Sequence, residues 1–597
     1  MIDTKLSDND IFLNKLFNKH VISSIISMFG VMASVMANSI IAGRFFGAEG
    51  LAVMSVATPF YFIFATIGSL TGVGGSTFTS YALGRDDMNS ANESFSLSVI
   101  LSASISIVTG LIFLVFLEPI LYLLGCSTEI YDIAYKYSVP FLIGGFGITM
   151  FYLPYNFFKL VGKLKWLTNL FLGMAAANII LDIVCVKIFA MGIDGIAFGT
   201  VISSIGTSFL GLKLLLRDDF TLIRHFDLKS ALKLMKLGTP PALNNLLIFF
   251  RLMIMNRIIT AIAGSVGLAA FSVFSALENF SMVILAGLAQ ATSAFVGVFS
   301  KEMDTVSVRR IEKRAHILGM ALILILMAFI ILYHYDICIF FGIYDSEKLI
   351  IASKAAFIFA FSLPPSVCCY LMFFYYQAAG FTNLANILIF CRSFLFLVVP
   401  AYFLAPIFGL QAVWASLTIA SISPLIIMLI AMPYYFKKGY SGVFLQDLHA
   451  EKDKTYISFA VDTNTEAIVD SVDKIVDFCR QNELTKKEIM LVRLSMEEMM
   501  MSIKEHCFEE NVNETIDVRI LIIKKKNDLM IVLRIRNGGN LFNPIDYYEK
   551  LQEDDPLAMG DALGIGMIIK AADAIHYKTT FGINNLTIII DRKGMVR

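Results

Sequence analysis

Four of the ionisable side chains within the long apolar runs of this sequence could carry chemistry: Asp182, Arg251, Glu278 and Arg392. Charged groups at membrane depth are costly and usually serve a function, so each is a candidate site residue. Asp182 follows Asn178 by four positions, which places the carboxylate and the amide on one face of a helix. Such a pair could bind a cation or carry a proton. The alternative is a structural hydrogen bond between helices.

Glu278 is the strongest candidate for a titrating carboxylate or for the counter-charge of a bound cation. Its alternative role is to pair with Arg251 or Arg392, because a buried guanidinium is usually paired. Asn38 also lies in an apolar run, where its amide can form hydrogen bonds but cannot titrate. The predicted substrate- and ion-binding set is therefore Asn38, Asn178, Asp182, Arg251, Glu278 and Arg392.

Membrane-spanning helices must position these residues. Apolar residues make up 57% of the 597 residues and charged residues 16%, whereas soluble proteins have about 45–50% and 25%. This composition excludes a soluble enzyme. The 48 basic residues are balanced by 48 acidic residues, so the overall charge does not indicate binding to nucleic acid. A span needs about 20 apolar residues. Twelve stretches qualify, at about 20–43, 52–82, 95–118, 133–158, 167–190, 195–216, 240–263, 267–299, 315–334, 352–378, 385–408 and 411–436.

The loops between these stretches predict the orientation. The even-numbered loops hold roughly fifteen Lys and Arg residues against about four in the odd-numbered loops, which predicts that the even loops are cytosolic. Both ends of the membrane part, including the polar segment 1–19, then face the cytosol. We expect a multi-pass protein of the plasma membrane.

A repeat divides the membrane part. Residues 50–56 and 267–273 share five of seven residues at an offset of 217. The glycine pair Gly162 and Gly192 returns as Gly380 and Gly409, at offsets of 218 and 217. We therefore predict two six-helix halves, 20–220 and 221–438. Six spans is an even number, so the halves are parallel repeats, and a substrate site is expected between them near mid-bilayer.

The composition changes after residue 438. Residues 439–454 are predicted to form a linker, and residues 455–597 a cytosolic α/β sandwich. Alternating apolar residues predict a strand at 456–461 and a hairpin over 517–536. Helical spacing predicts helices at 464–481 and 485–506, and a further helix that begins near Gly566 and ends near Ala574. Strands at 576–581 and 586–591 close the domain.

Residues 20–438 resemble the multidrug and toxic compound extrusion (MATE) transporters. The resemblance implies secondary antiport, in which an organic cation or drug leaves as Na⁺ or H⁺ enters. Many similar family members carry an Asp five residues before the Gly of the Gly-Arg pair, and Gly43 places Asn38 there. Asp182 or Glu278 would then carry the ion coupling. The matching segments are 41–47 (IAGRFFG), 72–77 (GVGGST), 82–86 (ALGRD), 178–182 (NIILD), 191–197 (MGIDGIA), 234–240 (LMKLGTP) and 408–414 (FGLQAVW).

The C-terminal domain resembles the GHKL ATPases, especially the anti-sigma-factor kinases. The matching segments are 498–506 (EMMMSIKEH), 537–539 (NGG) and 563–566 (LGIG). The resemblance implies ATP and Mg²⁺ as cofactors of this domain, whereas the membrane part requires none. Glu498 would be the general base. Ser502 replaces the Asn that helps to hold Mg²⁺, Asn537 replaces the Asp that accepts from adenine, and Gly539, Gly564 and Gly566 complete the nucleotide site.

These changed positions favour a transporter with a regulatory domain over an enzyme. The alternative for the domain is a degenerate module that binds a regulatory protein. Two other functions stay open. One is a flippase for lipid-linked substrates, which would need more cationic charge than Arg251 and Arg392 clearly provide. The other is a sensor or transceptor that signals through the domain. However, only about twenty residues separate the last span from Thr455, which is too short for a phosphoacceptor helical hairpin at about 1.5 Å per residue.

Overall fold

A computed structural model describes residues 8–83, 87–161, 163–223, 227–301, 304–447, 454–508, 514–525, 528–554, 563–580 and 583–593. Gly162 of the repeat and residues 448–453 of the predicted linker lie outside these ranges. The chain divides into two compact units. The membrane unit comprises residues 21–297 and 315–431, and the C-terminal unit comprises residues 1–20, 298–314 and 432–597.

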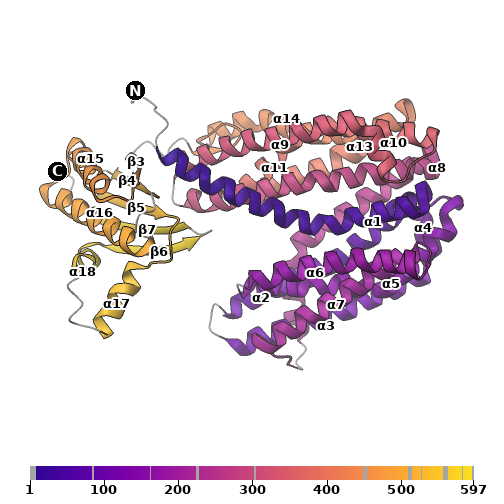
Figure 1. Cartoon of the computed structure of the whole chain (residues 1–597), viewed down its shortest axis with the longest axis horizontal. Helices are drawn as coiled ribbons and strands as arrows, with labels where there is room; N and C mark the ends of the chain where they lie inside the picture. The colour runs from indigo at the N-terminus through magenta and orange to yellow at the C-terminus, as the bar shows by residue number, and fades with distance from the viewer. Residues whose placement is uncertain are drawn as a thin grey trace. The chain divides into compact units, whose positions relative to one another are not determined.

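Helices build the membrane unit (Figure 1). The first half of the membrane part contains the helices α1 (Asp8–Gly68), η1 (Ser69–Val73), α2 (Gly74–Leu83), α3 (Met88–Val115), α4 (Leu117–Leu123), η2 (Thr128–Ile130), α5 (Tyr131–Leu160), α6 (Leu164–Ile183), η3 (Val184–Ile188) and α7 (Asp194–Asp218). The second half contains α8 (Leu228–Lys301), α9 (Thr305–Phe340), α10 (Ser346–Ala360), α11 (Leu363–Ala378), α12 (Thr382–Phe390), η4 (Cys391–Leu395), α13 (Phe396–Phe408) and α14 (Leu410–Lys437). Residues 8–19, predicted as a polar segment before the first span, are thus the first turns of α1.

The described part of the chain contains nine helices that are long and apolar enough to cross a membrane. The bent pair α10 and α11, which meet at 50°, adds a tenth if it forms one span. The chain is therefore a polytopic helical membrane protein, as its composition predicts.

Both of the longest helices contain a break at a glycine. α1 is interrupted at Gly47 (φ 61°, ψ −150°) and α8 at Gly264 (φ 55°, ψ −142°). Glycine adopts a positive φ without the steric penalty that a Cβ atom would bring. The two breaks lie 217 residues apart, which is the offset of the sequence repeat. Each half therefore contains a glycine break at the equivalent position.

Several close contacts between the halves lie at the end that carries the odd-numbered loops. Arg44 donates from Nε to the carbonyl of Phe340 at 3.1 Å, and Thr260 donates to the carbonyl of Gly125 at 2.6 Å. A methyl group at Gly43 would overlap the carbonyl oxygen of Phe341. The two halves therefore touch backbone to backbone at this end.

A five-stranded antiparallel sheet forms the centre of the C-terminal domain (Figure 1). Its strands are β3 (Lys454–Asp462), β4 (Thr515–Lys525), β5 (Asp528–Asn537), β6 (Ala574–Thr580) and β7 (Ile583–Lys593), in the order β3-β4-β5-β7-β6. The helices are α15 (Thr465–Gln481), α16 (Lys486–Cys507), α17 (Pro544–Asp554) and α18 (Leu563–Ala571). The sequence did not predict α17. Within the predicted linker, β1 (Tyr440–Ser441) and β2 (Gln446–Asp447) pair as a short hairpin.

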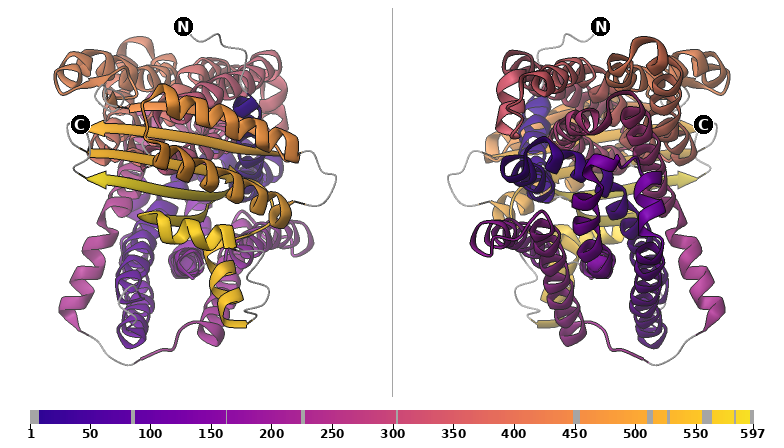
Figure 2. Two further views of the ribbon diagram at one scale, coloured as in Figure 1. Left: turned by 90° about the vertical axis from the view of Figure 1, so that its left-hand side faces the viewer. Right: turned by 90° about the vertical axis from the view of Figure 1, so that its right-hand side faces the viewer.

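One face of this sheet is covered by helices and forms the apolar core (Figure 2). Alternate residues of a strand point to the same face, so each strand contributes every second residue. From β4 these are Ile516, Val518, Ile520 and Ile522, and from β5 they are Ile531, Leu533 and Ile535. The hairpin predicted over 517–536 corresponds to the antiparallel pair β4 and β5.

Candidate functional site

Four polar side chains from three helices meet in the first half of the membrane unit. Asn178 on α6 donates from Nδ2 to Asp182 Oδ1 at 3.3 Å and to Thr200 Oγ1 at 3.2 Å. Asn38 on α1 donates from Nδ2 to the same Thr200 hydroxyl at 3.0 Å. The structure thus brings together three predicted site residues and adds Thr200 on α7. We refer to these four residues as the Asp182 cluster.

Three of the four members of the Asp182 cluster are buried, and Thr200 is half-buried. Asp182 is 0% exposed, Asn178 2% and Asn38 8%. α7 approaches α6 closely because residue 199 is a glycine, and a methyl group there would overlap the Asp182 carboxylate. The π-helical turn η3 begins two residues after Asp182, and such turns are frequent at functional sites. Close packing thus holds a carboxylate, two amides and a hydroxyl within one small volume.

This donor set suits a small hard cation or a proton. Carboxylate, amide and hydroxyl oxygens are the ligands that hard cations prefer in proteins. A carboxyl group can also take up and release a proton, whereas the amides and the hydroxyl cannot. Asp182 is therefore the member of the cluster that can change its charge.

The predicted residues of the second half form a separate cluster. Arg251 and Glu278, both on α8, are ion-paired at 3.4 Å between Nη1 and Oε1. Arg392 in η4 is 4% exposed, donates to the Tyr370 hydroxyl at 3.1 Å, and lies 4.7 Å from the centre of that ring. Its other terminal nitrogen donates to Ser366 at 3.3 Å. Glu278 thus occupies the position of an ion-pair partner, and Tyr370 and Ser366 were not identified from the sequence.

Three of the predicted nucleotide residues, Glu498, Gly564 and Gly566, lie at or beside the N-terminus of α18. A methyl group at Gly564 would overlap the carboxylate of Glu498, and one at Gly566 would meet Tyr548 at 2.5 Å. The carbonyl of Ser502 lies 2.9 Å from His506 Nδ1, and the His506 ring stacks on Phe542 with 4.3 Å between ring centres. Glu498 and the two glycines are therefore brought together as the resemblance implies.

The adenine end of this arrangement does not fit an ATP site of the expected form. The side-chain oxygen of Asn537 accepts from the backbone N–H of Gly539 at 3.1 Å and from Asn584 Nδ2 at 3.0 Å. A carbonyl oxygen has two lone pairs, and both are directed to protein donors here. The amino group of adenine would have to displace one of them.

Comparison with protein families supports the reading of the membrane unit. The model of the family described as MatE matches residues 23–184 and again residues 240–403. The second match begins 217 residues after the first, which is the offset of the repeat and of the two glycine breaks. The matched residues include every member of the Asp182 cluster except Thr200.

Curated relatives and solved structures agree with this match. The multidrug export protein MepA of Staphylococcus aureus is 25% identical over 272 residues, which are 44% of this chain and 60% of MepA. The Staphylococcus haemolyticus MepA is 25% identical over 309 residues, which are 49% and 68% of the two chains. The chain thus spans about 60% of the length of the S. aureus relative.

Two solved structures show the fold. An inward-facing multidrug resistance MATE family transporter of the MOP superfamily aligns with a TM-score of 0.61 at 20% identity, over 68% of this chain and 96% of that chain. A MOP superfamily transporter from Pyrococcus furiosus, described as having a binding pocket of reverse polarity that suggests a different function, aligns with a TM-score of 0.55 at 20% identity, over 71% and 96%.

Proposed function

Because this chain belongs to the MatE family, we propose that its membrane unit is a secondary antiporter that exports organic cations or drugs in exchange for Na⁺ or H⁺. Members of this family are transporters, in agreement with the prediction of a transporter rather than an enzyme. The observation that carries the proposal is the Asp182 cluster, in which a buried carboxylate accepts from an amide and lies next to a hydroxyl to which two amides donate. Such a group can hold the coupling ion while the substrate site faces one side, and release it on the other.

The twelve-span arrangement is part of this proposal. The breaks at Gly47 and Gly264 each divide a long helix into two spans, and the bent pair α10 and α11 counts as one. With these divisions, each half holds six spans, and both halves enter the membrane in the same direction. Both termini then lie in the cytosol of a plasma-membrane protein.

The second half offers little positive charge for the lipid-linked substrates of a flippase. Glu278 pairs with Arg251 at 3.4 Å, so Arg251, Glu278 and Arg392 together carry a net charge of only about +1. An anionic lipid-linked headgroup would be expected to need more positive charge than this.

Transport by the purified full chain in proteoliposomes tests the proposal. We expect an imposed gradient of Na⁺ or of H⁺ to drive uptake of a fluorescent organic cation, because an antiporter couples ion movement in one direction to substrate movement in the other. Vesicles with neither gradient provide the control. Uptake that responds to neither ion would reject the antiporter, and signalling without flux would favour the transceptor.

The C-terminal domain is proposed to regulate the membrane unit rather than to act as an enzyme. Its order of elements and the position of Glu498 beside Gly564 support the resemblance to the GHKL fold. The side-chain oxygen of Asn537 already accepts two hydrogen bonds from protein groups, which argues against tight binding of ATP. The regulatory ligand is then another protein or another part of this chain.

A nucleotide titration of the full chain follows from this geometry. We expect no saturable binding of a fluorescent ATP analogue with Mg²⁺ below about 1 mM, a dissociation constant that corresponds to roughly 4 kcal/mol of binding free energy. The reason is that adenine would have to break a bond between Asn537 and Gly539 or Asn584. Saturation at lower concentrations, reversed by unlabelled ATP, would contradict this expectation and establish a nucleotide site.

A further inference from the structure

The sheet of the C-terminal domain carries charged residues on the face opposite its apolar core. Asp517 and Arg519 on β4 lie beside Arg536 and Arg534 on β5, in the register Asp517–Arg536 and Arg519–Arg534. All four are buried, with exposed fractions of 2%, 5%, 1% and 6% in that order. Charged side chains on an open sheet face would remain in water. Their burial means that another part of the chain covers this face.

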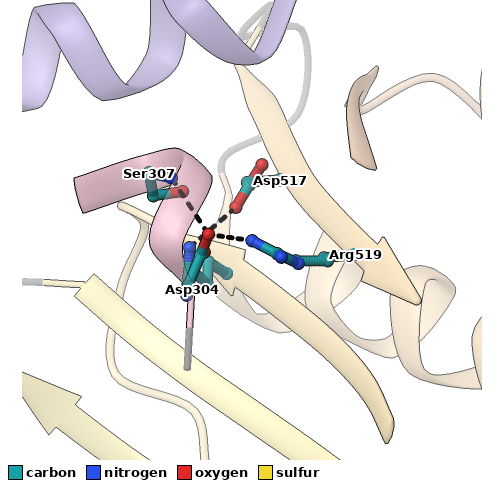
Figure 3. A network of polar contacts seen from close by, with 5 residues as sticks. Asp304, Ser307, Asp517 and Arg519 are labelled. Carbon is teal, nitrogen blue, oxygen red and sulfur yellow. Dashed lines mark hydrogen bonds and ion pairs between the residues drawn. The ribbon is translucent and has the colours of Figure 1, made fainter. Parts of the chain in front are cut away.

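Among the described residues, the end of α8 and the start of α9 contact this face, and both belong to the same compact unit as the sheet. Asp304 immediately precedes α9, and its carboxylate accepts from Arg519 (Figure 3). It also accepts from Arg536 at 3.2 Å. The guanidinium of Arg536 lies 4.5 Å from the centre of the ring of Phe299, in the last turn of α8. The two helix ends therefore contribute a charge and an aromatic surface to the sheet.

The charges of the sheet face call for an acidic partner. Without Asp304, the face presents three guanidinium groups and one carboxylate. Arg519 and Arg534 lie directly opposite each other, and like charges in that position destabilise a sheet. Arg536 pairs with Asp517 at 3.4 Å. Burial raises the pKa of the Asp517 carboxyl, and the positive charge of Arg536 opposes this shift. Asp304 adds a second carboxylate, which lowers the net charge of this buried set from +2 to +1.

Asp304 has a second role at the start of α9. Its Oδ1 accepts the backbone N–H of Ser307 at 3.0 Å, and its carbonyl accepts that of Val308 at 3.1 Å. It is thus the N-cap of α9, whose unpaired N–H groups favour an acidic residue. One carboxylate fixes the first turn of a membrane helix and binds two strands of the domain.

We propose that this charged sheet face is an intramolecular docking site whose ligand is Asp304, and that docking restrains transport by the membrane unit. The restraint rests on the proposed function, whereas the docking does not. α8, which carries Arg251 and Glu278, ends three residues before Asp304, and α9 begins one residue after it. A contact that stabilises one arrangement of these helices shifts their population toward it. The docked domain therefore slows the cycle, and undocking releases it.

Hydrogen exchange of the full chain in detergent or nanodiscs tests the docking. The variant is Asp304→Asn, because asparagine is as good an N-cap as aspartate but carries no charge. We expect amide exchange in β4, β5 and the first turn of α9 to rise by about tenfold, since two buried arginines lose a charged partner. Arg519→Gln should give the same pattern. The double variant should add little to either single change, because the two residues act through one contact.

Asp345→Asn is the matched control. Asp345 is the N-cap of α10 and accepts from the backbone N–H groups of Glu347 and Lys348, at 3.0 and 3.3 Å. This substitution should leave exchange in β4 and β5 unchanged. Unchanged exchange in both Asp304→Asn and Arg519→Gln would overturn the docking site.

Transport tests the restraint. In proteoliposomes, Asp304→Asn and a chain that ends at Tyr440 should both transport about fivefold faster than the full chain, the low end of typical coupling between sites. Asp345→Asn should match the full chain. Faster exchange without faster transport would overturn the restraint and leave the docking. Faster exchange in a protein that transports nothing under any gradient would support the docking and reject the proposed antiporter.

Discussion

Asp182→Asn is expected to reduce ion-driven transport by about 100-fold, which corresponds to roughly 2.7 kcal/mol of lost ion binding. Asparagine keeps the shape of aspartate and fits beside Gly199, but it has no charge to attract a cation and cannot exchange a proton. Initial rates of uptake in proteoliposomes, measured against the concentration of Na⁺ and against pH, provide the measurement. Counterflow of substrate without an ion gradient should be affected much less, because it needs no net ion movement.

Two companion variants make this result specific. Glu278→Gln removes the partner of Arg251, so we expect a loss of protein stability but an unchanged dependence on ion concentration. Asp132→Asn, at an exposed position in the first turn of α5, should behave as the unmodified chain. If Asp182→Asn kept its ion dependence and Glu278→Gln lost it, the coupling site would lie in the second half. If transport by both variants kept the ion dependence of the unmodified chain, neither Asp182 nor Glu278 would be the coupling residue.

Gly43→Ala is expected to slow transport by about tenfold or more. The new methyl group would overlap the carbonyl of Phe341, where α1 meets the end of α9. Overpacking of this kind typically costs about 1–3 kcal/mol. The conformation in which the two halves touch at this end would be populated less. The transport cycle would then spend more time in conformations in which this end is open. Spin-label distances between the two halves at this end should lengthen in the variant.

Gly206→Ala provides the control for this second prediction. Gly206 also lies in a membrane helix, α7, but a methyl group there meets nothing within 4 Å. It should leave both the transport rate and the distances unchanged. Equal rates for Gly43→Ala and the unmodified chain would show that this contact between the halves does not limit the cycle.

The sequence predicted contacts within one element better than contacts between elements. Asn178 and Asp182 could be paired because positions i and i+4 of a helix always share a face. Asn38 was identified as a polar residue, but nothing in its sequence neighbourhood indicates that Thr200 is its partner. Thr200 reaches the cluster because α7 packs closely on α6, which the small size of Gly199 allows.

The C-terminal domain shows the same limit. Alternation in β4 and β5 identified the strands and their apolar face. The charged residues between them, such as Arg519 and Arg536, are indistinguishable in sequence from residues of a solvated face. Their partner Asp304 lies 215 residues from Arg519 along the chain. α17 was not predicted because its polar composition resembles that of the loops beside it.

The matching glycine corners of α1 and α8 bear on how a duplicated scaffold can diverge. A positive φ admits few other residues, so the two copies have the same backbone constraint at Gly47 and Gly264. No such constraint acts on the side chains that each copy directs inward, and the two differ there: one holds an acidic cluster and the other a set of arginines with their partners. Symmetry of the framework is thus compatible with asymmetry of chemistry. Under the proposed antiport, the first half would bind the ion and the second would contribute to the substrate site.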